Sequence, residues 1–139
     1  MSGERRHGSE RKKERLRALL YLADQDTEAA ELLAAHDNHY AAYHCQQAAE
    51  KLIRVLLLHH DIEPGLDHHL DVLVAKLPDD EPWKAKLALF HKYTPYATTY
   101  RYATSAGRIP ISPEAAGVTS DAAHLAALIA DARRQLLGD

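Results

Sequence analysis

The chain has 139 residues, a length that suits one domain with a hydrophobic core of its own. Hydrophobic residues make up 46% and charged residues 27% of the sequence, which is ordinary for a globular protein in water. No apolar run approaches the roughly 20 residues that cross a bilayer, and the charged N-terminus lacks the apolar segment of a signal peptide. Because Cys45 is the only cysteine, an intramolecular disulfide is excluded, and we expect a cytoplasmic protein that does not bind membranes.

The net charge of −3 is distributed unevenly along the chain. Residues 1–17 carry seven Arg or Lys and three Glu, a net charge of +4, so the remaining 122 residues carry −7. Two interpretations stay open: a solubilising start of the first helix, which is the more ordinary one, or a basic arm that contacts phosphate groups. We expect residues 1–9, which include Gly3 and Gly8, to form a disordered arm, and residues 10–139 to form a single helical domain.

The first long helix is predicted from Ser9 to about His36. Apolar or small side chains recur along it at spacings of four and three, as in the contact seam of a helical bundle. These are Leu16, Leu20, Ala23, Thr27, Ala30 and Ala34. Asp37 and Asn38 then predict a tight turn, with Asn38 as the cap of the next helix. A turn this short makes the first two helices antiparallel.

The stretch from Tyr40 to His60 predicts the central helix, because it has no Gly or Pro and is dense in Ala and Leu. Two stripes separate on it at about 100° per residue. The apolar stripe predicts the side that faces the core: Ala41, Cys45, Ala48, Leu52, Val55 and Leu56. The polar stripe beside it, either a solvated face or a site, contains Tyr40, His44, Gln47, Lys51 and Arg54, flanked by Tyr43 and Glu50.

Three further helices are predicted downstream. A short helix spans 68–77 with Asp67 as its cap, and a helix from Trp83 to about Thr94 places Trp83, Leu87 and Phe90 on one face until Pro95 ends or kinks it. One helical turn is expected at 113–116, capped by Ser112. The last helix spans about 120–137 with an apolar seam of its own: Val118, Ala122, Leu125, Ile129, Ala132 and Leu136.

The predicted fold class follows from this count of elements. Four main helices and one short helix, without a long run of alternating polarity, indicate an all-α, up-and-down four-helix bundle.

The central helix resembles the signature helix of HEPN domains, which are small α-helical modules. The stretch YHCQQAAEKLIRVLL follows their pattern of aromatic-His-x-Gln-Gln-Ala-x-Glu-Lys and an apolar-basic run at His44, Gln46, Gln47, Ala48, Glu50 and Lys51. Downstream, His68, Leu70 and Leu73 match a His-Asp-Leu motif in which His69 replaces the Asp. Tyr96, Arg101 and Tyr102 match a Tyr and Arg-Tyr-Pro pattern in which Ala103 replaces the Pro. The resemblance covers about Asp24 to Leu137.

The resemblance implies a role for the polar stripe. Non-catalytic HEPN proteins bind nucleotides or RNA, or pair with a separate minimal nucleotidyltransferase in toxin–antitoxin modules, and they commonly form homodimers. Our favoured expectation is such a binding module without a cofactor. Lys and Arg would contact phosphates, and Tyr could stack on a base. The candidate ligand-binding residues are His44, Gln47, Glu50, Lys51, Arg54, Arg101 and Tyr102.

Two alternatives remain. Catalytic members of the resembled family are metal-independent ribonucleases with an Arg followed four to six residues later by a His, and Arg54 and His59 have this spacing. In the family, however, a polar residue follows the Arg, where this chain has Val55, and the motif opens a later helix. The other alternative is a protein-interaction module without a nucleotide, in which the polar side chains satisfy one another.

The ten histidines and the single cysteine predict no metal centre or nucleophile. Neither a His-Glu-x-x-His motif nor a Cys/His zinc pattern occurs, so we expect solvated or capping histidines and no bound metal. Cys45 lies on the predicted core stripe, where a small buried hydrophobe is the expected role.

Overall fold

The computed structural model describes residues 2–97 and 102–139, with side chains described from residue 8 onward. The described residues form helices and no strand, which confirms the all-α fold class. In chain order the elements are α1 (Ser2–Ala35), α2 (Ala41–His59), α3 (Leu70–Ala75), α4 (Lys84–Ala88), the 3₁₀ helix η1 (Leu89–Ala97), α5 (Ala115–Ala132) and the π-helical segment η3 (Arg133–Leu137). None of the described helices is long and apolar enough to span a membrane.

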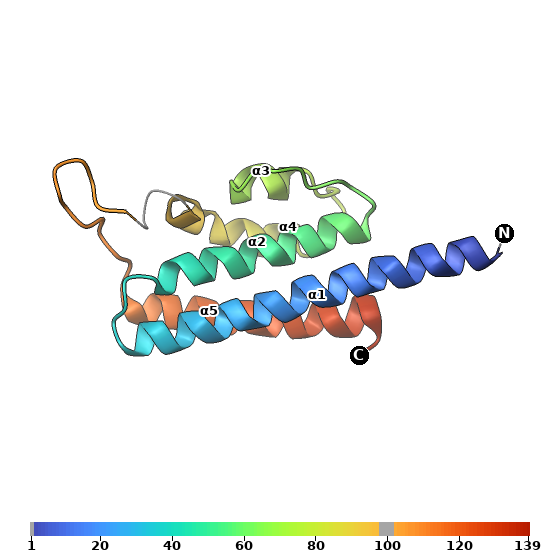
Figure 1. Ribbon diagram of the computed structural model, residues 1–139, viewed down its shortest axis with the longest axis horizontal. Helices are drawn as coiled ribbons and strands as arrows, with labels where there is room; N and C mark the ends of the chain where they lie inside the picture. The colour runs from blue at the N-terminus through green and yellow to red at the C-terminus, as the bar shows by residue number, and fades with distance from the viewer. Residues whose placement is uncertain (1, 98–101) are drawn as a thin grey trace.

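Figure 1 shows α1, α2 and α5 running side by side along the long axis of the molecule, with α3 and α4 above α2. The continuous segment of α4 and η1 takes the place of the fourth bundle helix, and α2 contacts α1, α5, α3 and η1. The helix with the strongest sequence signal is therefore the one that every other part of the fold packs against.

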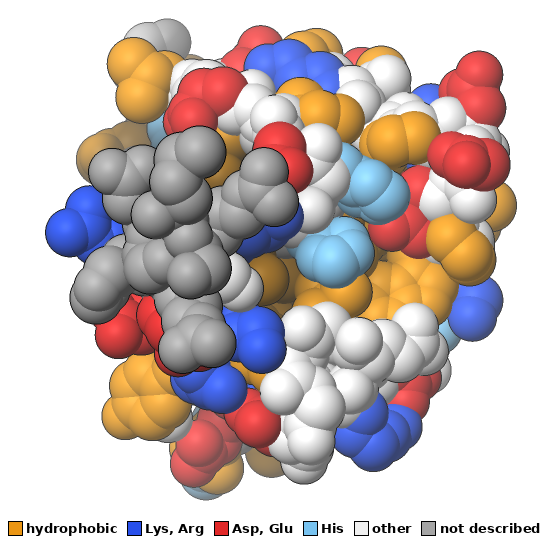
Figure 2. Space-filling model, turned by 90° about the vertical axis from the view of Figure 1, so that its right-hand side faces the viewer, with side chains coloured by type: hydrophobic (Ala, Val, Ile, Leu, Met, Phe, Trp, Pro, Cys, Tyr) orange, Lys and Arg blue, Asp and Glu red, His pale blue; other side chains and the backbone are white. Residues whose placement is uncertain are grey.

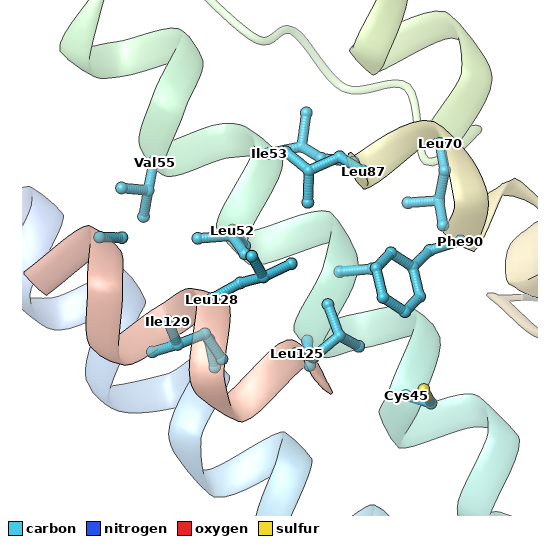
Figure 3. Close-up of a cluster of buried hydrophobic side chains, with 14 of the residues drawn as sticks. Cys45, Leu52, Ile53, Val55, Leu70, Leu87, Phe90, Leu125, Leu128 and Ile129 are labelled. Atoms are coloured by element: carbon cyan, nitrogen blue, oxygen red, sulfur yellow. The ribbon is translucent and has the colours of Figure 1, made fainter. Parts of the chain in front are cut away.

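The core is built around α2. All six residues of its predicted apolar stripe are buried, and they meet side chains such as Leu125 and Ile129 of α5 and Phe90 of η1 (Figure 3). The predicted seams of α1 and α5 are confirmed by the burial of all their members except Leu136. Because α3 and η1 cover its other side, α2 also buries Gln46 and Glu50, two polar residues that need partners.

The first helix begins further toward the N-terminus than expected. α1 starts at Ser2 instead of Ser9, and its first turns extend beyond the end of the bundle in Figure 1. The division into an arm of residues 1–9 and a domain of residues 10–139 stays a prediction.

The turns that follow α1 and α2 each contain an aspartate with a positive φ angle, 55° at Asp37 and 59° at Asp61. In each case the next residue closes the helix end: the amide of Asn38 donates to the carbonyl of Leu33, and that of Ile62 to Leu57, both at 2.8 Å. The side chain of Asn38 accepts from the amide of Tyr40, one residue ahead of α2. The turn is confirmed, but Asn38 orders the loop before the helix and does not cap it.

The shorter elements differ in detail from the sequence prediction. α3 begins at Leu70, because Asp67 bonds the amide of His69 and forms a turn there instead of capping the helix. The buried face of Trp83, Leu87 and Phe90 is confirmed. Pro95 does not end the segment: from Leu89 the chain tightens into a 3₁₀ helix that includes this proline.

The last helix begins at Ala115, earlier than the predicted position 120, and has no break at Gly117. Ser112 contacts His39 with its hydroxyl, 3.3 Å from Nδ1, and does not cap a separate turn. At the C-terminal end of this helix, η3 is π-helical, with more residues per turn than an α-helix. This change of period explains why Leu137 is buried and Leu136 only half-buried, where the regular seam predicted Leu136.

Candidate functional site

The polar stripe of α2 meets a carboxylate from α1. Asp26 accepts a hydrogen bond from Lys51 Nζ at 2.5 Å, and its other oxygen lies 3.1 Å from His44 Nδ1. His44 and Lys51 are about two turns apart on one face of α2, and antiparallel α1 places Asp26 at a level between them. The sequence analysis missed Asp26, although its position next to the buried seam residue Thr27 was a signal that it faces α2.

A chain of hydrogen bonds runs from this pair into the protein. Lys51 Nζ donates to Gln47 at 3.5 Å, Gln47 Nε2 donates to Gln46 at 2.6 Å, and Gln46 Nε2 donates to Glu50 at 3.1 Å. Gln46 is fully buried and Glu50 is 6% exposed. The two glutamines of the signature helix thus connect a half-buried lysine to a buried carboxylate.

Arg54 fastens a loop onto α2. Its two terminal nitrogens each donate at 2.8 Å, one to the carbonyl of Gly65 and one to that of Asp67. Its Nε lies 3.4 Å from Glu50, whose other oxygen is 3.0 Å from His68 Nδ1. Arg54 and Glu50 therefore act together as a clamp on the loop between α2 and α3.

His59 lies in different surroundings. Its ring packs edge-on against that of His60, and it lines a hollow of about 270 Å³ with Glu81 and Trp83. Partial burial, and then the proximity of His60 and Lys12, lower the pKa of His59 below its usual value. Figure 2, which views this end of the molecule, shows histidines over hydrophobic side chains with Lys and Arg nearby. Arg54 and His59 contact separate segments, and their joint catalytic role stays a prediction.

A larger hollow of about 470 Å³ lies where α1 passes the end of α2. It is lined by three cationic side chains of α1, two acidic and three small or apolar residues: Arg11, Lys12, Arg15, Asp61, Glu63, Gly8, Leu58 and Ile62. Lys12 Nζ bonds the carbonyl of His59 at 2.8 Å and Asp61 at 3.0 Å. We call this feature the cationic hollow. The basic N-terminal charge predicted from the sequence thus faces the body of the protein at this point.

The cationic hollow and the Asp26 cluster lie on one seam between α1 and α2. Leu58 follows Lys51 by about two turns of α2, and Arg15 precedes Asp26 by about three turns of α1, so each pair shares a helix face. The two sites therefore lie on the same side of the antiparallel pair.

The remaining two expected site residues are Tyr102 and Arg101. Tyr102 is largely exposed at the start of the loop that projects beyond the bundle in Figure 1. Arg101 lies outside the described residues. Their expected approach to α2 stays a prediction.

Metal ligands and nucleophiles do not gather in the described part of the chain. No three His, Cys, Asp or Glu side chains there could hold a metal ion together. Burial, and then the charge of Asp121, raise the pKa of Cys45 to about 12, so its thiol stays protonated.

The fold is an all-α bundle, and its central helix carries both the core stripe and the candidate site. These two features define a class of small helical domains. Within this class, the family model of the HEPN domain matches residues 16–132, which is most of the chain. The chain belongs to the HEPN domain family, as its signature helix indicated. Comparison with curated proteins and with solved structures found no match.

Proposed function

We propose that this HEPN-domain protein binds a nucleotide or RNA along the seam between α1 and α2 without cleaving it. The observation that supports this most directly is the cationic hollow. Its volume of about 470 Å³ lies in the range of small-ligand sites, and three cations of α1 line it.

The lining suits a phosphorylated ligand with an apolar face. Arg11 and Arg15 offer planar guanidinium groups, which bind phosphate oxygens in a bidentate way. Leu58 and Ile62 supply an apolar surface for a base or ribose. Asp61 neutralises part of the charge through Lys12, so the two arginines are the strongest determinants of binding.

A longer ligand would continue toward the Asp26 cluster. His44, Gln47 and Lys51 offer donors on a half-buried surface, and only one carboxylate, Asp26, directly holds Lys51 and His44 among the described residues. A phosphate that competes for Lys51 would find its side chain already ordered, which lowers the entropic cost of binding.

A binding role agrees with the contacts of Arg54. Its guanidinium is fully engaged by Glu50 and by two loop carbonyls, and it would have to release the loop to reach a phosphate. We therefore expect purified protein to leave total RNA intact in the presence of EDTA. RNA cleavage by the wild type that is lost in an Arg54→Ala/His59→Ala variant would make the protein a ribonuclease and overturn this part of the proposal.

The family also supports a proposal about partners. We propose that the protein forms a homodimer and pairs with a minimal nucleotidyltransferase in a toxin–antitoxin-type module. Co-purification of the two proteins, expressed together, is the direct measurement.

Thermal unfolding with nucleotides and a short single-stranded RNA tests the binding site. A ligand at 100 times its dissociation constant adds about 2.7 kcal/mol to the free energy of unfolding. This ligand-induced shift should vanish in Arg11→Ala/Arg15→Ala and weaken in Lys51→Ala. The control is Lys86→Ala, an exposed lysine on α4. The absence of any shift in the wild type at millimolar ligand would refute the proposal.

A further inference from the structure

Residues 102–112, which precede α5, project from the bundle and contain a hydrogen-bonded turn. Within it, the amide of Thr104 donates to the carbonyl of Arg108 at 2.7 Å, and the amide of Gly107 donates back to Thr104 at 2.8 Å. Gly107 has a φ of +76°, a conformation that glycine adopts without strain. We call residues 102–112 the projecting arm. In Figure 1 it extends away from the end of the bundle where α1 turns into α2.

The arm presents apolar side chains to solvent. Ile109 is 75% exposed and Ile111 is 91% exposed, and Pro110 between them restricts the backbone. Two isoleucines so placed contribute nothing to the core of their own chain. Contiguous exposed apolar surface, unlike single scattered apolar residues, marks sites of protein contact.

The base of the arm is anchored, which fixes the direction in which it points. Ser112 contacts His39 in the α1–α2 turn, and Pro113 lies in a small hollow lined by Ala34, Asn38 and Ala41. Because one end of the arm is held, little entropy is lost when a partner binds it.

An apolar groove lies beside α3, which Figure 1 places above α2. It has a volume of about 390 Å³ between α3 and α4 and is lined by Asp71, Val74, Ala75, Ala88 and His91. Its floor consists of small apolar side chains, and Val72 and Leu89 next to it are exposed.

Arm and groove have complementary charges. Arg108 precedes Ile109 on the arm, and Asp71 stands on the rim of the groove. Within the described ranges 2–97 and 102–139, neither side chain takes part in an ion pair. An isoleucine that enters the groove would bring Arg108 toward Asp71, which would add a charge-assisted contact to apolar burial.

We infer that the projecting arm of one copy docks its isoleucines into the α3–α4 groove of a second copy, and that the reverse contact forms at the same time. In Figure 1 the arm projects from one end of the molecule, and α3 lies above the middle of α2. A two-fold axis between them places each arm over the groove of the partner, which gives a closed, self-complementary dimer. This inference deepens the homodimer proposed above by naming its interface.

Sedimentation equilibrium of the full chain over a range of concentrations tests this interface. Ile109→Ser/Ile111→Ser should raise the dimer dissociation constant by at least about tenfold, because two apolar anchors are lost from each of two contacts. Arg108→Asp and Asp71→Arg should each weaken the dimer, and the combination Arg108→Asp/Asp71→Arg should restore it. All these positions are exposed, so the monomer fold should be unaffected, as circular dichroism would verify.

The outcomes separate this inference from the proposals before it. A wild-type monomer at about 100 µM overturns both the dimer and its interface, because a specific dimer of this kind should be populated there. A dimer that is indifferent to the arm variants, or that the charge exchange fails to restore, overturns the interface but not the dimer. Loss of nucleotide binding in Arg11→Ala/Arg15→Ala concerns the cationic hollow alone.

Discussion

The two halves of the polar row on α2 belong to one helical stripe but meet different partners. The first half contains His44 and Lys51. It faces α1, and the carboxylate of Asp26 holds both side chains. The second half, Glu50 and Arg54, faces the loop before α3 and is held by backbone carbonyls and His68. Residues of one motif thus divide into a set that pairs with α1 and a set that fastens the loop before α3.

This difference sets the expected order of mutational effects. A buried carboxylate with three partners is costly to remove, because Arg54, whose side chain is only 18% exposed, loses its compensating charge. An ion pair near the surface is worth much less. The following changes measure the contrast, from the largest expected loss of stability to the smallest.

Glu50→Ala should lower the free energy of unfolding by about 3 kcal/mol, because Arg54 loses its compensating charge and Gln46 loses one of its acceptors. Urea denaturation measures this loss. The control is Glu28→Ala on the exposed side of α1, which should change stability little. An equally small effect of Glu50→Ala would show that the clamp of Glu50 and Arg54 does not stabilise the fold.

Arg54→Ala should cost about 2 kcal/mol, since hydrogen bonds from a charged donor to Gly65 and Asp67 are lost. The loss should be local, so hydrogen exchange should accelerate in residues 62–69 more than in α5. Arg54→Lys should not restore protection, because an ammonium cannot reproduce the fork of two donors. Uniform acceleration through the bundle would contradict a local clamp.

The core-facing stripe of the same helix predicts an alkaline loss of stability. The pKa of Cys45 is raised from 9.0 to about 12 by burial, so the thiol ionises in the unfolded chain before it does so in the folded one. The stability is fully present below pH 9 and is lost as pH rises from 9 toward 12. At pH 10 the loss due to this group is about 1 kcal/mol. Urea titrations at pH 8 and pH 10 should show a smaller difference in Cys45→Ala, and identical differences would contradict this assignment.

Lys51→Ala should have the smallest effect on stability, below about 1 kcal/mol, because its ion pair with Asp26 is open to water on one side. The same substitution should weaken the ligand-induced thermal shift. A large loss of stability without a change in ligand response would place Lys51 with the structural half of the row, and the comparison of the two halves would fail.

Helical periodicity predicted the core well, since burial in a bundle repeats with the helix itself. Leu16, Cys45 and Leu125 were all placed correctly by spacing alone. Periodicity could not predict the partner of Lys51, because Asp26 lies on another helix and the level at which the two helices meet depends on the turn. It also missed the burial of Glu50, whose partner His68 comes from an irregular loop.

Proline and glycine predicted the ends of the helices less well than apolar spacing predicted the core. Pro95 suggested a boundary, and the last helix was expected only from about residue 120, but the packing of Tyr93 and Val118 against the core outweighs the local cost of Pro95 and of Gly117. The change from Leu136 to Leu137 at the C-terminal end follows from a π-helical segment, which leaves no signature in the spacing of apolar residues.

Asp61, in the turn after α2, affects both the stability of the fold and the charge of the cationic hollow. Asp61 holds a left-handed backbone conformation that costs a non-glycine residue about 1 kcal/mol, and it also brings a negative charge into the cationic hollow. Asp61→Gly would relieve the strain and free Lys12 in one step, at the expense of an exposed ion pair of small value. Most substitutions that raise anion affinity add positive charge, and the repulsion between like charges lowers the stability of the fold. Under the proposed binding role, Asp61→Gly should therefore raise both the free energy of unfolding and the affinity for an anion.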